Sequence, residues 1–148
     1  MDLGFPFNQR WGLKIWRAAY LEPPATAPVA GNSALWNQGR LLVEGAAHCA
    51  ACHTARNLAG ARLSDTEHFR GNPDLPDGGK APAIDMNSLM KNGWDVDNLA
   101  YALKSAVMPD GDTFGGSMAE VVFNGTSFLN EQDRKAIATY LLDTHEGG

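Results

Sequence analysis

Residues 49–53, Cys-Ala-Ala-Cys-His, decide how the rest of this 148-residue chain is interpreted. Two residues separate the cysteines and a histidine directly follows the second, which is the spacing of a covalent attachment site for a c-type haem. Each cysteine sulfur can form a thioether bond with one vinyl group of the porphyrin, and the imidazole can bind the iron. We therefore expect one covalently bound haem c, attached at Cys49 and Cys52 and ligated by His53.

Two other kinds of site also use a Cys-x-x-Cys pair. A thioredoxin-like redox pair expects a βαβ pattern, which the sequence does not show. A zinc site needs further ligands at short spacing. The chain has no other cysteine, and its remaining histidines, His48, His68 and His145, do not form such a pair. His53 directly after the second cysteine therefore favours haem, and His48 beside the site is expected to be structural.

Charge and hydropathy narrow the class of protein. A net charge of −5 argues against a nucleic-acid partner. No stretch reaches the roughly 18 apolar residues of a membrane span, and the first residues lack the basic start and apolar run of a signal peptide. Because c-type haem is attached outside the cytoplasmic membrane in bacteria, we expect a periplasmic location, with association with the inner membrane as a further expectation. Met1 is then interpreted as the start of a mature or trimmed chain.

The chain divides into an N-terminal arm with a linker, residues 1–31, and a domain, residues 32–148. Residues 9–21 are predicted to form a short helix, with Asn8 as its N-cap, and residues 22–31 are a proline-rich linker. The helix separates an apolar face (Trp11, Ile15, Trp16, Ala19, Tyr20) from a basic one (Arg10, Lys14, Arg17). It either packs on its own domain or docks on a partner domain or a membrane surface.

Further helices are predicted over residues 34–45, 96–106 and 131–142, with a short helical turn over 118–123. Their caps are Ser33 or Asn32, Asp95 and Asn130. Gly39 lies in mid-helix, where glycine is costly unless another helix crosses closely, and Tyr140 is its predicted partner. Residues 54–93 are expected to be a long loop whose apolar side chains cover the porphyrin. The predicted fold class is all-α: three to four helices around one haem.

The second axial ligand is expected to be a methionine, because a thioether opposite histidine is common in electron carriers. Of the methionines between the last two long helices, Met118 is favoured because Gly115 and Gly116 precede it and would let the backbone approach the porphyrin. Met108, followed by Pro109, is the alternative. A third interpretation leaves both as core residues and the iron open or bound by another group.

Two more side chains are candidates for contact with the haem propionates. Arg56 would neutralise a propionate, with a solvated surface arginine as the alternative. Trp94 would donate its indole N–H, with an ordinary core aromatic as the alternative.

With these residues in hand, the chain resembles a haem domain of the periplasmic multi-haem cytochrome c subunits of bacterial membrane-associated dehydrogenases, those for alcohol, gluconate, sorbitol or aldehyde. The resemblance is carried by FPFNQRW (5–11), WNQGRLLVEGAAHCAACHTARN (36–57), PDGDTFGGSMAEVV (109–122) and LNEQDRKAIATYL (129–141). It implies that Met118 is an iron ligand and that electrons pass from a dehydrogenase towards quinone or an oxidase. Family chains usually hold other haem domains before the FPFN-like segment, where this chain begins. This suggests a single-haem relative or an excised domain.

The expected function is therefore one-electron transfer without enzymatic chemistry, with a dehydrogenase subunit, an oxidase or another cytochrome as the redox partner. One alternative is an open-site haem protein that acts as a peroxidase or a small-gas sensor. A second alternative is a docking module in which the helix at 9–21 has the main role.

Overall fold

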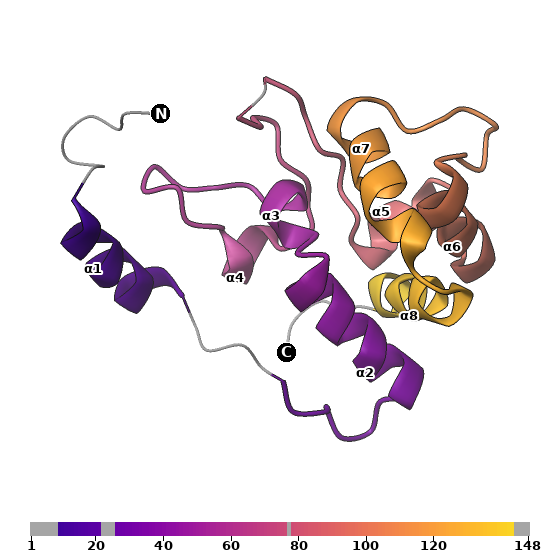
Figure 1. Ribbon diagram of the computed structural model, residues 1–148, viewed down its shortest axis with the longest axis horizontal. Coiled ribbons are helices and arrows are strands. Elements are labelled where there is room, and N and C mark those ends of the chain that lie inside the picture. Colours follow the sequence, from indigo (N-terminus) through magenta and orange to yellow (C-terminus); the bar gives the residue numbers. More distant parts are fainter. Residues whose placement is uncertain (1–8, 22–25, 77, 144–148) are drawn as a thin grey trace.

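The computed structural model describes residues 9–21, 26–76 and 78–143 (Figure 1). Its longer helices are α1 (Arg10–Tyr20), α2 (Ala34–Leu41), α6 (Val96–Ser105), α7 (Gly116–Asn124) and α8 (Glu131–Leu142). The short elements are a π-helical turn η1 (Leu42–Ala46), α3 (Ala50–His53), α4 (Ser64–Glu67), α5 (Met86–Lys91) and a 3₁₀ turn η2 (Thr126–Phe128). Over these residues there is no strand, only isolated bridges such as Thr54 with Gly71. None of the described helices is long and apolar enough to cross a membrane.

The predicted caps explain where three helices begin. Ser33 Oγ accepts a hydrogen bond from Trp36 N at 3.1 Å at the start of α2. Asp95 starts α6 with a full capping box, in which its side chain and that of Asn98 each bind the other's backbone N–H. Asn130 Oδ1 accepts from the backbone of the third residue of α8 at 2.8 Å. These local hydrogen bonds satisfy N–H groups that a helix end leaves free.

Helix α8 is the centre of the packing, with α2 on one side and α6 on another (Figure 1). The predicted crossing of α2 and α8 at Gly39 and Tyr140 is confirmed. A Cβ added to Gly39 would collide with the backbone of Ala136 and lie 2.8 Å from Tyr140 Cβ. The indole of Trp36 packs edge-on against the Tyr140 ring, with the ring centroids 5.0 Å apart.

Four predicted segments differ from the structure. The helix after Ser33 does not stay α-helical to Gly45, because η1 inserts a π turn from Leu42. The stretch 54–93 contains α4 and α5 and is not one continuous loop. Helix α7 begins two residues earlier than predicted, so Met118 lies within it. Helix α6 ends at Ser105, because Ala106 adopts a left-handed conformation (φ 63°). The all-α class holds, with short helices added to the predicted set.

Helix α1 lies at the opposite side of the molecule from α5–α8 (Figure 1). It buries none of its residues, and Trp16 Nε1 ties it to the domain through Ala59 O at 2.9 Å. Trp11 and Ile15 on its apolar face are 63% and 62% exposed. The predicted cap Asn8 lies outside the described residues, and Gln9 occupies the cap position, although its side chain does not cap the helix. The division into arm and domain stays a prediction.

Candidate haem centre

The two cysteines lie on a single helical turn. Cys49 directly precedes α3, and its carbonyl accepts from Cys52 N at 3.2 Å and from His53 N at 3.0 Å. Cys49 is half-buried and Cys52 is exposed, and neither is in a disulfide. Burial raises the pKa of the Cys49 thiol to about 12, and the nearby charges of Glu44 and Cys52 act in the same direction. The turn thus presents two sulfurs from neighbouring positions, as attachment to two vinyl groups requires.

His53 is held as an axial ligand would be. Its Nδ1 lies 2.8 Å from Pro82 O. A carbonyl oxygen only accepts, so Nδ1 carries the proton and Nε2 keeps its lone pair for a metal. The ring is buried, and burial lowers the pKa of His53 although its hydrogen bond to Pro82 acts in the opposite direction. The imidazole is therefore neutral at physiological pH, in the form that binds iron.

Two segments of the loop after α3, residues 69–71 and residues 82–84, hold His53 in place. Gly71 N donates to His53 O at 2.9 Å, and Ile84 N donates to Phe69 O at 2.8 Å, which ties residues 69–71 to residues 82–84. Gly71 has φ +92°, and a Cβ there would lie 2.9 Å from Ala81 O, so only glycine fits. This support could not be predicted from the sequence, in which Pro82 is expected only as apolar cover for the porphyrin. The Cys49, Cys52 and His53 set therefore fits a covalent haem.

Met118 lies half-buried in the first turn of α7 and packs against the hydrophobic core. Gly116 has φ +53°, which by itself favours glycine, whereas a Cβ added to Gly115 would meet no protein atom within 4 Å. The described protein thus gives no steric reason for Gly115. Met108 lies in a separate turn, with its N–H bound to Asp112 O at 2.7 Å. The choice of Met118 as iron ligand stays a prediction.

The two propionate candidates have protein partners. Arg56 donates from Nη1 to Gly60 O at 2.7 Å and from Nη2 to Ala51 O at 3.1 Å, which fastens the following loop to α3. Trp94 stacks on Phe114 with centroids 6.0 Å apart. Their contact with propionates stays a prediction.

The zinc interpretation gains no support from the structure. Across residues 9–21, 26–76 and 78–143, no three His, Cys, Asp or Glu side chains are grouped so as to hold a metal ion. His48, the nearest other histidine in sequence, is exposed and has φ +38°.

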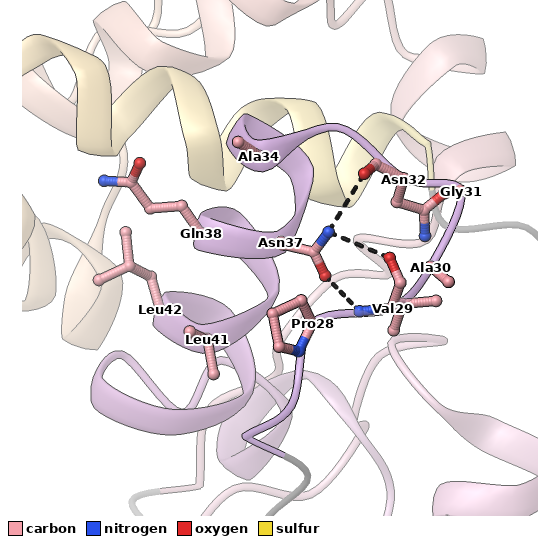
Figure 2. Close-up of a pocket in the computed structure, with 10 residues that line it drawn as sticks. All are labelled: Pro28, Val29, Ala30, Gly31, Asn32, Ala34, Asn37, Gln38, Leu41 and Leu42. Carbon is pink, nitrogen blue, oxygen red and sulfur yellow. Dashed lines mark hydrogen bonds between the residues drawn. The ribbon is translucent and has the colours of Figure 1, made fainter.

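A separate hollow of about 690 Å³ lies between residues 28–32 and α2 (Figure 2). Its walls include Val29 and Leu41, and Asn37 bridges the loop by accepting from Val29 N at 2.7 Å and donating to Asn32 O at 3.3 Å. None of the residues predicted to hold haem lines this hollow.

A model of the cytochrome c family matches residues 37–145, which include the C-terminal part of α2, the attachment turn, Met118 and α8. The chain belongs to the cytochrome c family. This membership confirms the predicted fold class, and it supports a covalent haem c and electron carriage in place of enzymatic chemistry. Nothing in the comparisons favours the peroxidase or gas-sensor alternative.

The curated relatives are longer proteins. The chain is 42% identical to a diheme cytochrome c-type protein of Cereibacter sphaeroides and 36% identical to a nicotinate dehydrogenase subunit of Pseudomonas putida. It is 33% identical to the cytochrome c subunit of a quinone-dependent alcohol dehydrogenase of Komagataeibacter europaeus. Each match covers 95% of this chain, but this chain spans only 45%, 12% and 31% of these relatives, respectively. The predicted resemblance to dehydrogenase cytochrome subunits is thereby confirmed.

Proposed function

We propose that this cytochrome c domain carries one haem and relays single electrons from a periplasmic dehydrogenase, or a similar donor, towards a quinone or oxidase pathway. The observation that carries the proposal is the buried His53 ring, oriented by Pro82 O, directly after the cysteine pair. A single Cys-x-x-Cys-His stretch in the sequence supports one haem. The relatives named as dehydrogenase subunits support the kind of donor.

Each residue in this proposal has a separate task. Cys49 and Cys52 anchor the porphyrin edge, and His53 ligates the iron through Nε2 with its ring fixed by Pro82. Met118 would supply a second, sulfur ligand to the iron, which would favour the ferrous state and raise the potential. When bound, haem supplies the one-electron redox chemistry; the protein sets the potential and the route to partners. Arg56 and Trp94 are assigned to the propionates.

The partner in this proposal is a protein: a dehydrogenase subunit, an oxidase or another cytochrome. Helix α1 is the candidate docking element, because its apolar face is exposed and it carries Arg10, Lys14 and Arg17 but no acidic residue. The same features suit the surface of the inner membrane. The periplasm is proposed as the location, because c-type haem is attached outside the cytoplasmic membrane in bacteria.

The experiment is production in a bacterial periplasm with the haem attachment machinery present. Intact-mass analysis should show one haem per chain, retained through acid–acetone extraction, and a potentiometric titration should follow a reversible one-electron curve. The ferrous protein should not bind CO, because His53 and Met118 would both ligate the iron. Haem that is released by extraction would contradict covalent attachment. A high-spin ferric spectrum with ready CO binding would favour the open-site alternative.

A further inference from the structure

Helix α1 and the turn between α3 and α4 adjoin each other and together form one exposed surface. The turn, residues 57–60, is held by Asn57, whose Oδ1 accepts from the backbone N–H groups of Ala59 and Ala61 at 2.9 and 3.0 Å. Trp16 Nε1 donates to Ala59 O at 2.9 Å, which holds α1 against this turn. Figure 1 shows the segment between α3 and α4 extending towards α1, away from α6 and α8. We call α1 and residues 57–60 together the α1 surface.

Apolar side chains project from both parts of the α1 surface. Trp11 and Ile15 are one helical turn apart on α1, so they lie in one row, and each residue is more than half exposed. Leu58 projects from the tip of the turn and is fully exposed. A single exposed apolar residue is ordinary, but a group of them on adjoining elements marks a surface that meets an apolar phase or a partner.

Positive charge lies beside this apolar row. Arg10, Lys14 and Arg17 are spaced i, i+4 and i+7, and they form the neighbouring row of α1. Residues 9–21 and 54–63 hold five of the chain's 12 Lys and Arg residues and none of its 17 Asp and Glu residues. Among the residues that the structure describes, no ion pair involves the three cations of α1. The α1 surface is therefore basic, whereas the rest of the chain is strongly acidic.

We propose that the α1 surface binds an anionic lipid membrane, with its apolar side chains in the lipid interface and its basic row at the lipid phosphates. The inference rests on the proposed periplasmic electron carrier and specifies what α1 docks on. An amphipathic helix with Lys and Arg on its polar face and Trp on its apolar face is the kind that lies in a membrane interface. The charges are complementary, because lipid phosphates attract the basic row and repel the acidic remainder of the chain, which orients the domain.

A lipid surface suits these side chains better than a protein partner does. Leu58 projects from the tip of a turn, and the row of Trp11 and Ile15 projects from a helix that buries none of its residues. A protein would need matching pockets to receive them, because the cores of protein interfaces are packed as closely as protein interiors. A fluid lipid interface admits such side chains without a matching shape.

The α1 surface is joined directly to the haem attachment turn. Arg56 donates to Gly60 O in the turn of the α1 surface and to Ala51 O between the two cysteines. Membrane contact through the α1 surface would therefore bring the attachment turn close to the bilayer. That is where the quinone of the proposed pathway would be dissolved.

The test is co-sedimentation of the holoprotein with lipid vesicles at low salt. The holoprotein should bind vesicles made of equal amounts of phosphatidylglycerol and phosphatidylcholine, and should bind phosphatidylcholine vesicles about 100-fold more weakly. This ratio follows from three cations that each strengthen binding to an anionic surface about fivefold. Binding to the anionic vesicles should weaken as salt is added, because salt screens the attraction.

Variants separate the α1 surface from other exposed side chains. Lys14→Gln should weaken binding to the anionic vesicles about fivefold, and the matched control Lys91→Gln, an exposed lysine of α5, should leave it nearly unchanged. Trp11→Ala and Leu58→Ala should each weaken binding several-fold, whereas Phe128→Ala, 81% exposed in η2, should not. All five side chains are exposed, so the substitutions leave the core intact.

A second measurement uses the unmodified holoprotein. Hydrogen exchange should slow in α1 and residues 57–60 when the anionic vesicles are added, and should not slow in α6 or α8. Equal binding to both kinds of vesicle would overturn the proposal, as would control variants that weaken binding as much as Lys14→Gln and Leu58→Ala.

Absence of vesicle binding would also overturn the proposal. If Trp11→Ala then abolished self-association of the holoprotein in analytical ultracentrifugation, the occupant of the α1 surface would be a second copy of this chain. Vesicle binding is measured without any redox step. Failure of the proposed carrier function is therefore recognised separately, as the lack of a reversible one-electron couple in solution.

Discussion

His53 and Met118 would ligate the same iron, but the structure provides different kinds of evidence for the two ligands. The His53 ring has a backbone partner, Pro82 O, that fixes which nitrogen faces the metal. A thioether is only a weak hydrogen-bond acceptor, so Met118 needs no such partner and packs with apolar side chains. A histidine ligand is therefore visible from its hydrogen bond, whereas a methionine ligand is inferred from its position and from resemblance.

Replacing Met118 distinguishes the electron-carrier function from the open-site alternative. Met118→Ala should leave the haem attached, since both thioethers are independent of the axial position. It should open the iron to CO and cyanide and lower the potential, because the soft sulfur donor is lost. The measurements are the sulfur-to-iron charge-transfer band, ligand-binding titrations and potentiometry.

Met108→Ala is the matched control, because Met108 is also half-buried but lies in a separate turn. It should keep the charge-transfer band and the potential. If Met108→Ala abolishes the band and Met118→Ala retains it, the two assignments exchange. If neither variant changes the spectrum, neither methionine ligates the iron.

The sequence predicts some of the site residues, but it does not predict the residues that hold them in place. The attachment residues and His53 lie within five consecutive positions, so their local spacing alone is enough to predict a role for each of them. The partners of His53 and Glu44 lie far along the chain: Pro82 across a loop, and Tyr140 in the last helix. No local pattern encodes such contacts, because they form only when the loop and α8 are in place.

At the scale of elements, the crossing of α2 and α8 offers a sharp stability test. A side chain at Gly39 must displace the backbone of Ala136, which cannot yield as a flexible side chain could. Gly39→Val should therefore lower the free energy of unfolding by at least the ~1–3 kcal/mol typical of overpacking, measured by chemical denaturation of the holoprotein.

Gly45→Val is the matched control for this test. Gly45 lies in η1, directly after α2, and a Cβ there would meet nothing within 4 Å. Its effect should be confined to the change in local backbone preference. Equal losses in the two variants would show that propensity, and not the helix crossing, explains the glycine at position 39.

The helices that sequence predicted best are those with a capping side chain and a long apolar stripe, α6 and α8. Helix α5 has a capping aspartate, Asp85, but spans only Met86–Lys91 and buries one side chain, Leu89, so its periodicity is too short to recognise. Helix α4 is shorter and has no side-chain cap. The π turn η1 follows an unbroken helical pattern, and the extra residue per turn leaves no signature in composition.

At the scale of the molecule, the protein's own core is concentrated at one side. Buried aliphatic and aromatic side chains gather where α2, α5, α6 and α8 meet. Residues 54–85 contain one four-residue helix and are held by isolated bridges and single hydrogen bonds. In the described part of this stretch, the buried apolar side chains are Ala61 and Phe69, and Leu58 is fully exposed. The loop that supports His53 therefore has little apolar packing of its own beyond Phe69.

Removal of the haem should consequently destabilise the whole domain. The double variant Cys49→Ala/Cys52→Ala cannot attach haem covalently. Its loop then lacks the apolar surface of the porphyrin and the iron–His53 bond, both of which would stabilise the folded state but not the unfolded state. We expect lower helix content in circular dichroism and a lower, broader thermal transition than in the holoprotein. Cys52→Ala, which keeps the thioether at Cys49, should lie between the two. A haem-free double variant that melts as cooperatively, and at the same temperature, as the holoprotein would show that the polypeptide supports residues 54–85 without the porphyrin.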